Sequence, residues 1–361
     1  MPARNDDAGP LPLVGRDLAG LAEVVAALGV PEAHRRMRAR QLFRWIYARG
    51  AGDFEQMTDL PAALRDGLAE RCTIARPELI AEERSADGTR KWLLRFADGQ
   101  EVESVFIPEE DRGALCVSTQ VGCTLSCSFC RTGTMPLVRN LSAGEILAQM
   151  LVARDLLDEW PTGRPGRRFT NIVVMGMGEP LLNYDNLATA LGIAMDPAGL
   201  DLSRRRITVS TSGVVPRIDQ CGRELGTGLA VSLHAVRDEL RDRLVPINRR
   251  WNIASLLDAC RRYPVRRRIT FEYVMLAGVN DSDADARELV RLLRGIPAKV
   301  NLIPFNAWPG APFACSSNNR MRAFAAIVEE AGIAAPVRQP RGRDILAACG
   351  QLRTASRRRA A

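Results

Sequence analysis

Gly122-Cys123-Thr124-Leu125-Ser126-Cys127-Ser128-Phe129-Cys130 is the stretch that decides how this chain is interpreted, because it places three cysteines in one short loop. A four-iron cubane cluster usually has one cysteine thiolate on each iron. Three thiolates leave one iron without a protein ligand, and that iron can bind a small molecule and act on it. The spacing therefore predicts an iron–sulfur cluster with an open position.

Two other roles for these cysteines are compatible with the spacing alone. Cys116 precedes Cys123 by seven positions and could complete a four-thiolate zinc site. A disulfide pair is the second alternative, although nothing in the sequence indicates an oxidising compartment.

Length and composition indicate a folded, reduced protein. The 361 residues suffice for one large and one smaller domain, and a hydrophobic content of 46% supports a sizeable core. The sequence contains no apolar run of the roughly 18 residues that a membrane span needs. The first residues lack the apolar stretch of a signal peptide, so we expect nine reduced cysteines in a cytoplasmic protein with no membrane partner.

The charge balance points to a polyanionic partner. Fifty basic and 42 acidic residues give a net charge of +8, and only Lys91 and Lys299 are lysines. Basic clusters suit phosphate backbones, and they occur at Arg35–Arg36–Arg38–Arg40, Arg204–Arg205–Arg206, Arg261–Arg262, Arg266–Arg267–Arg268 and Arg357–Arg358–Arg359. His34 and His234 are the only histidines, so acid–base chemistry is expected from carboxylates and thiols.

Hydrophobic periodicity divides the chain into two parts. Helical spacing from Asp17 to about residue 70 is followed by three strand-like segments, 79–84, 90–96 and 101–107, with Asp-Gly turns between them. After Pro108, strands and helices alternate, which predicts a parallel sheet with covering helices. We expect six such units in an incomplete (β/α)6 barrel, with strands at 115–119, 171–175, 207–211, 229–234, 269–275 and 300–305.

Polar residues follow several of these strands. In such folds the active site lies at the carboxyl ends of the strands, and the cysteine loop follows the first one. Glu179 ends the glycine-rich turn after the second strand, and its carboxylate suits an ammonium group. The other residues at these ends are Ser210, Ser232, Leu233, His234 and Asn306.

Over residues 18–352 the chain resembles the RlmN/Cfr RNA methyltransferases, a family of the radical S-adenosylmethionine (SAM) superfamily. The resemblance rests on the cysteine loop and on matching stretches before and after it. These are Val102-Glu103-Ser104-Val105, Leu115-Cys116-Val117-Ser118-Thr119-Gln120-Val121, Arg139-Asn140-Leu141-Ser142, Gly176-Met177-Gly178-Glu179-Pro180, Ser210-Thr211-Ser212-Gly213, Ser232-Leu233-His234-Ala235, Val245-Pro246-Ile247-Asn248, Asn301-Leu302-Ile303-Pro304-Phe305-Asn306 and Ala348-Cys349-Gly350-Gln351-Leu352.

The resemblance implies a [4Fe-4S] cluster on Cys123, Cys127 and Cys130, and two SAM molecules per turnover. Cys349 would carry the methyl group to the RNA base, and Cys116 would release the covalent protein–RNA adduct through a transient disulfide with Cys349. Glu103 would be the proton acceptor. The SAM site would be lined by Gly178, Glu179, Ser210, Ser232, Leu233, His234 and Asn306.

The resemblance also implies the substrates, which are carbon 2 of adenosine 2503 in 23S rRNA and of adenosine 37 in tRNAs. An electron donor such as flavodoxin would reduce the cluster, and we expect the protein to be a monomer. The basic helix from His34 to Arg44 is a candidate RNA grip. Methylation at carbon 8 is the nearest alternative, and a non-catalytic, zinc-stabilised RNA-binding protein is an alternative of another class.

The expected organisation has four parts. Residues 1–16 are interpreted as a flexible tail, and 17–107 as a helical RNA-binding module with a β-meander. Residues 108–348 form the radical SAM partial barrel. Residues 349–361 carry the methyl-carrier cysteine and a basic tail.

Overall fold

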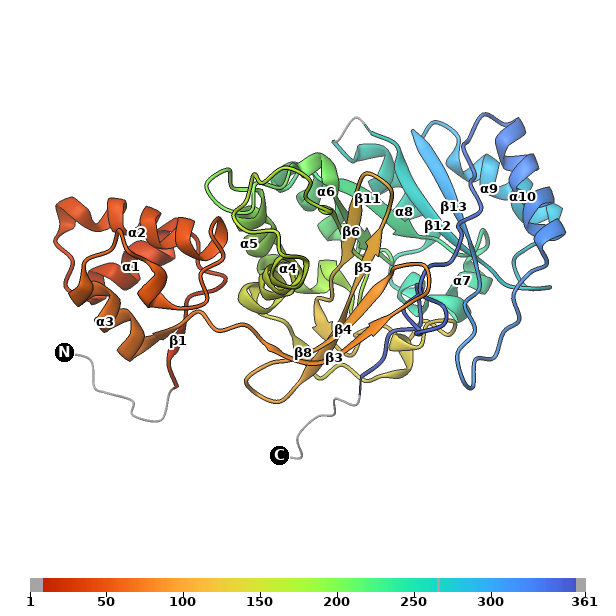
Figure 1. The fold of residues 1–361 in the computed structure, drawn as a ribbon. Coiled ribbons are helices and arrows are strands. Elements are labelled where there is room, and N and C mark those ends of the chain that lie inside the picture. The colour runs from red at the N-terminus through yellow and green to blue at the C-terminus, as the bar shows by residue number, and fades with distance from the viewer. Residues whose placement is uncertain (1–8, 265–266, 355–361) are drawn as a thin grey trace.

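The computed structural model describes residues 9–264 and 267–354, and its N-terminal part is a small helical module (Figure 1). Its elements are β1 (Leu11–Pro12), α1 (Leu18–Ala27), α2 (Glu32–Tyr47), η1 (Phe54–Gln56), α3 (Ala62–Arg71) and β2 (Cys72–Thr73). The Asp17 carboxylate accepts a 2.8 Å hydrogen bond from the Gly20 amide and caps α1. Met37, which helical spacing places on the inner face of α2, is instead 45% exposed.

The described part of the expected tail packs against the N-terminal module. β1 pairs in parallel with β2, and the Leu13 side chain is completely buried. The Tyr47 hydroxyl also donates to the Leu13 carbonyl over 3.2 Å. Residues 9–16 therefore belong to the N-terminal module, while 1–8 lie outside the described residues.

Six parallel strands confirm the incomplete (β/α)6 barrel. They are β6 (Gly113–Cys116), β9 (Phe169–Val174), β10 (Ile207–Thr211), β11 (Gly228–Ser232), β12 (Ile269–Met275) and β13 (Ala298–Pro304). They lie side by side in chain order, and each neighbouring pair is parallel. The helices of this part are α4 (Ala143–Leu157), α5 (Tyr184–Met195), α6 (Val215–Glu224), α7 (Asp238–Leu244), α8 (Ile253–Arg262), α9 (Asp283–Leu293) and α10 (Asn318–Glu330).

The β-meander continues the barrel sheet. β3 (Glu78–Arg84), β4 (Arg90–Arg95) and β5 (Glu101–Pro108) are antiparallel, and β5 pairs with β6, so that one sheet has nine strands. The sheet thus crosses the boundary that we placed at residue 107. Turn signals reveal the hairpins, but they do not show which strand pairs with the free edge of β5.

The C-terminal segment, residues 342–354, folds back onto this meander (Figure 1). The Gly342 amide donates to Asp87, and the Asp344 carboxylate accepts from the Ser85 hydroxyl over 2.6 Å. The segment therefore joins the end of the chain to strands formed about 250 residues earlier. The basic tail Arg357–Arg359 lies outside the described residues.

Several basic clusters lie away from the carboxyl ends of the strands. Arg204–Arg206 form η4, directly before β10. Arg261 and Arg262 end α8, and Arg267 and Arg268 precede β12. These clusters flank the amino ends of strands, which leaves α2 as the better candidate for contacting a polyanion. In the part of the chain that the structure describes, none of the helices combines the length and apolar composition that a membrane span requires.

Candidate active site

The cysteine loop is held at both of its ends. β7 (Gln120–Val121) pairs antiparallel with β8 (Arg139–Asn140), so the intervening residues form a closed loop. Gly122 has a φ of +76°, and a Cβ there would lie 2.1 Å from the Pro136 carbonyl oxygen, so only glycine fits. Within the loop, the Ser128 amide donates to the Leu244 carbonyl at the end of α7 over 3.1 Å.

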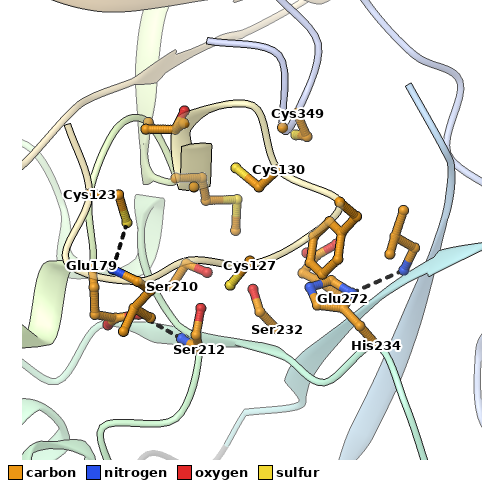
Figure 2. A pocket seen from close by; sticks show the side chains of 18 of the residues that line it. Cys123, Cys127, Cys130, Glu179, Ser210, Ser212, Ser232, His234, Glu272 and Cys349 are labelled. Carbon is orange, nitrogen blue, oxygen red and sulfur yellow. Dashed lines mark hydrogen bonds between the residues drawn. The ribbon is translucent and has the colours of Figure 1, made fainter. Parts of the chain in front are cut away.

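The three loop cysteines line a cavity at the carboxyl ends of the strands. Figure 2 shows Cys127 below Cys130, with Ser210 and Ser232 beside it, Cys123 to the left, and Cys349 beyond Cys130. Of the residues expected at the site, those that line this cavity are Cys123, Cys127, Cys130, Gly178, Glu179, Ser210, Ser232, His234, Asn306 and Cys349. Sequence motifs about 225 residues apart thus meet in one place.

Leu233 does not line the cavity. Its side chain is completely buried in the core. Its carbonyl oxygen accepts a hydrogen bond from Arg241 Nε over 3.0 Å, and its amide donates to the Glu272 carbonyl. Leu233 therefore supports the neighbouring strand ends, and no contact of its side chain with a bound ligand is expected from this position.

Glu179 is a buried carboxylate with one side toward the cavity. Its Oε1 accepts from the Leu181 amide over 3.2 Å, and its Oε2 accepts from the Ser212 amide over 2.8 Å. Burial raises its pKa, and these hydrogen bonds oppose the increase. The Thr211 and Ser212 hydroxyls also donate to this carboxylate, and a ligand ammonium in the cavity would compete with these neutral donors. Gly178 has a φ of +98°, and a Cβ there would lie 2.5 Å from Gln120 Cβ.

His234 is a neutral part of the cavity wall. Its φ is +59°, and its Nδ1 accepts from the Val274 amide over 3.0 Å. Its ring meets the Phe129 ring edge-on, with centroids 4.6 Å apart. Burial, with a smaller contribution from Arg241, lowers the His234 pKa to about 3. This residue therefore packs against the cysteine loop at Phe129 and carries no charge at neutral pH.

Arg241 is a buried residue of this site that sequence reasoning missed. Its guanidinium donates to the carbonyls of Ser212 over 2.6 Å, Ser232 over 3.0 Å and Leu233 over 3.0 Å. It also donates to Asn248 over 2.8 Å. One side chain from α7 thus joins the ends of β10 and β11. The only signal in the sequence is an arginine between leucines in a short helix.

Glu272 is the second residue that was missed. It lies in β12, lines the cavity and accepts from Asn301 Nδ2 over 2.9 Å. Burial raises its pKa, and its charge contributes to raising the pKa of Cys349. The signal in the sequence was a carboxylate inside the mostly apolar stretch Ile269–Met275.

The C-terminal segment brings Cys349 to the cavity. Asn306 donates to the Cys349 carbonyl over 3.2 Å, and the Arg131 amide donates to the Gly350 carbonyl over 2.7 Å. The thiol lines the cavity and is accessible to solvent, and the surrounding protein raises its pKa to about 11. Asn306 thereby holds the segment as well as lining the cavity.

Cys116 and Glu103 lie behind the cavity lining. Cys116 is a buried, free thiol on β6, and burial and the charge of Cys349 both raise its pKa above the usual range. Glu103 is buried on β5, where its Oε2 accepts from the Arg353 amide over 2.7 Å and its Oε1 lies 3.1 Å from Lys91 Nζ. Glu103 thus contacts the segment that carries Cys349.

The residues present fit a cluster better than a single ion. No group of three or more His, Cys, Asp or Glu side chains within 9–264 and 267–354 is placed to hold one metal ion. A cubane cluster binds each thiolate to a different iron, so its ligands spread around it. Three soft thiols in one loop, facing one cavity, match that requirement. Burial raises their pKa values, and bound iron would reverse this effect by stabilising the thiolates.

Comparison with known proteins agrees with this geometry. The family model described as the radical SAM superfamily matches residues 117–290. A radical SAM methyltransferase from Sphaerobacter thermophilus has a crystal structure that superposes with a TM-score of 0.89 at 50% identity, covering 95% of this chain and 99% of that one. Fold and site therefore define a radical SAM enzyme, a class that uses a [4Fe-4S] cluster and SAM.

The particular family follows from closer relatives. The model of the ribosomal RNA large subunit methyltransferase N-terminal domain matches residues 12–74. Two proteins named dual-specificity RNA methyltransferase RlmN are closely similar. The one from Dinoroseobacter shibae is 59% identical over 99% of this chain and 93% of its own length. The one from Rhodospirillum rubrum is 60% identical over 95% and 81%. The chain belongs to the RlmN family of radical SAM RNA methyltransferases.

Proposed function

We propose that this protein methylates carbon 2 of adenosine 2503 in 23S rRNA and of adenosine 37 in tRNAs. The observation that carries the proposal is that Cys349 lines the same cavity as Cys123, Cys127 and Cys130. Carbon 2 of adenine is electron-poor and does not attack a SAM methyl group by simple displacement, so a radical route is needed. The relatives' name, dual-specificity RNA methyltransferase RlmN, supports RNA substrates of two kinds, and the match to the ribosomal RNA large subunit methyltransferase domain supports rRNA as one of them. Carbon 2 and the tRNA substrate are what the resemblance to the RlmN branch implies.

Each residue of the site has a distinct role in this proposal. When bound, the cluster on Cys123, Cys127 and Cys130 supplies the electron for reductive cleavage of SAM. Glu179 accepts hydrogen bonds from the SAM ammonium, and Gly178, Ser210, Ser232, His234 and Asn306 shape the rest of the pocket. Cys349 carries the one-carbon unit, Glu103 accepts the ring proton, and the Cys116 thiolate attacks the Cys349 sulfur to release the product.

The remaining partners follow from the substrates. The exposed arginines of α2 are proposed to contact the RNA backbone. Because one chain builds the whole cavity, we propose a monomer as the working unit. A one-electron donor such as flavodoxin would reduce the cluster, in the cytoplasm where ribosomes and tRNAs are found.

The two cysteines beyond the loop provide the test. Losing Cys349 removes the methyl carrier, so Cys349→Ala should form no RNA adduct. Losing Cys116 removes only the resolving thiolate, so Cys116→Ala should accumulate protein covalently joined to RNA. Denaturing electrophoresis of each variant, with and without nuclease, measures this asymmetry. Absence of a nuclease-sensitive band in both variants would exclude the covalent mechanism, and the reverse pattern would exchange the two roles.

A further inference from the structure

The meander carries a row of polar and charged side chains on the face shared with Cys116. Directly opposed residues of antiparallel strands share a face, and so do alternate residues of one strand. The registers are Glu83↔Lys91, Leu93↔Glu103 and Val105↔Cys116. Glu83, Lys91, Glu103 and Cys116 therefore lie on one face, from β3 across β4 and β5 to β6.

Lys91 is the centre of this row. Its side chain is 8% exposed, and its ammonium lies 3.0 Å from Glu83 Oε1 and 3.1 Å from Glu103 Oε1. The ammonium also donates to the Ile345 carbonyl over 2.7 Å. An ammonium has three protons, and these three acceptors come from β3, β5 and the C-terminal segment. One buried cation thus joins three parts of the chain.

The C-terminal segment contacts this row at two points, one on each side of Cys349. Ile345 accepts from Lys91, and the Arg353 amide donates to Glu103 Oε2 over 2.7 Å. Both oxygens of the Glu103 carboxylate therefore have a partner, one from β4 and one from the segment. Glu103 reaches its full set of contacts only when the segment that carries Cys349 is seated on the meander.

We propose that Lys91 is a positioning residue that holds the Glu103 carboxylate charged and oriented, and couples it to the docking of the Cys349 segment. The proposal rests on the proposed function, in which Glu103 accepts the ring proton. In that step the proton moves from the ring carbon to a carboxylate oxygen, and its bonding electron pair stays on the ring. Lys91 keeps its own protons throughout, so the step needs no further reactant.

The charges around Glu103 agree with this role. Burial raises the Glu103 pKa, whereas Lys91 and the Arg353 amide lower it, and Glu83 raises it slightly. Arg95 and Glu101 lie farther along the same face and pair with each other over 2.8 Å, and Cys116 is the titratable group that β6 adds to this face. A buried carboxylate without its cation tends to take up a proton. Without Lys91, Glu103 would therefore be protonated over a wider pH range and unable to accept the ring proton.

The experiment uses the full-length, cluster-loaded enzyme with substrate RNA. Lys91→Gln keeps a hydrogen-bond donor but removes the charge. It is expected to lower turnover by about a hundredfold and to accumulate the covalent adduct although Cys116 is present. The accumulated adduct should decrease as pH rises, because Glu103 regains its charge. Lys91→Arg restores the charge and should largely restore turnover without the adduct.

Glu83→Gln is the matched control, because it removes one partner of Lys91 and leaves the contact with Glu103. The turnover of this variant should stay within about twofold of the unmodified enzyme, because the Glu83 side chain is half exposed and its ion pair with Lys91 is weakened by solvent. Cys116→Ala is run in parallel. If Cys116→Ala traps the adduct while Lys91→Gln traps none and keeps the normal pH profile, the role of Lys91 is wrong. If Cys116→Ala traps none, the proposed function itself fails. If Lys91→Gln fails to load its cluster, Lys91→Arg, which keeps the charge, becomes the test. Accumulation of the adduct in Lys91→Arg would then overturn the proposal.

Discussion

At the scale of the residue, Glu179 combines two tasks in one buried carboxylate. It caps η3 (Pro180–Asn183) through the Leu181 amide and holds the end of β10 through the Ser212 amide. The same carboxylate also lines the cavity. Removing the whole side chain would therefore leave two backbone donors without a partner, an effect distinct from the loss of a ligand contact.

Replacing Glu179 separates these tasks. Glu179→Gln removes the charge and keeps one acceptor oxygen, so one of the two backbone amides loses its acceptor, but the fold and the iron content should be retained. A charge-assisted hydrogen bond to the SAM ammonium contributes roughly 1.5–3 kcal/mol, so SAM affinity should fall by about tenfold to a hundredfold. Calorimetric titration with SAM measures this loss of affinity. Glu179→Ala should in addition lower the midpoint temperature of thermal unfolding. Unchanged SAM affinity in the Gln variant would rule out the ammonium contact.

At the scale of the element, Arg241 of α7 bonds to the carbonyls at the ends of β10 and β11, in addition to the pairing of these strands with each other. The guanidinium is completely buried, and burial lowers its pKa to about 10. Parallel strands leave their terminal carbonyls without ladder partners, and these groups must find donors. Arg241 supplies those donors at the point where Ser210 and Ser232 line the cavity.

Arg241→Met should therefore destabilise the barrel mouth. The carbonyls of Ser212, Ser232 and Leu233 would lose a buried donor, at a cost of about 3–5 kcal/mol in the free energy of unfolding. Arg243→Met on the same helix is the control, because Arg243 is exposed and its loss should change stability by about 0.5 kcal/mol or less. Denaturant unfolding of both variants measures the difference. Equal stabilities would show that the strand ends do not depend on Arg241.

At the scale of the whole molecule, the candidate RNA contacts lie far from the chemistry in sequence. α2 lies in the helical module at one end of the molecule, and α9 and α10 lie at the other end (Figure 1). Arg36, Arg40 and Arg44 are exposed and recur every four residues, so they share one face of α2. The cavity lies in the barrel between these ends.

Changing these three arginines to alanine should weaken RNA binding without affecting SAM binding. Each phosphate contact contributes about 0.7–0.9 to the slope of log affinity against log salt, so the slope should become shallower by about 2. A triple change of exposed arginines elsewhere, Arg261, Arg294 and Arg322, is the control. Binding titrations with tRNA at several salt concentrations measure both. An unchanged slope in the α2 variant would place the RNA contacts elsewhere.

The sequence by itself determined the local features of this protein. Residue spacing in the cysteine loop indicated a cluster, and alternating periodicity located the six parallel strands to within a few residues. It also identified most of the cavity lining, because polar residues such as Glu179 and Ser210 directly follow strands whose carboxyl ends must meet.

Only the tertiary structure decided the contacts between distant segments. Lys91 and Ile345 are far apart in the chain, as are Arg241 and Ser212, and neither pair has a spacing that a periodic pattern could reveal. The pairing of β5 with β6 and the burial of Leu233 away from the cavity were likewise settled by packing. Hydrophobic periodicity indicates which face of a single helix or strand is buried. Hydrogen-bond partners and the depth of burial depend instead on which faces come together when the whole chain folds.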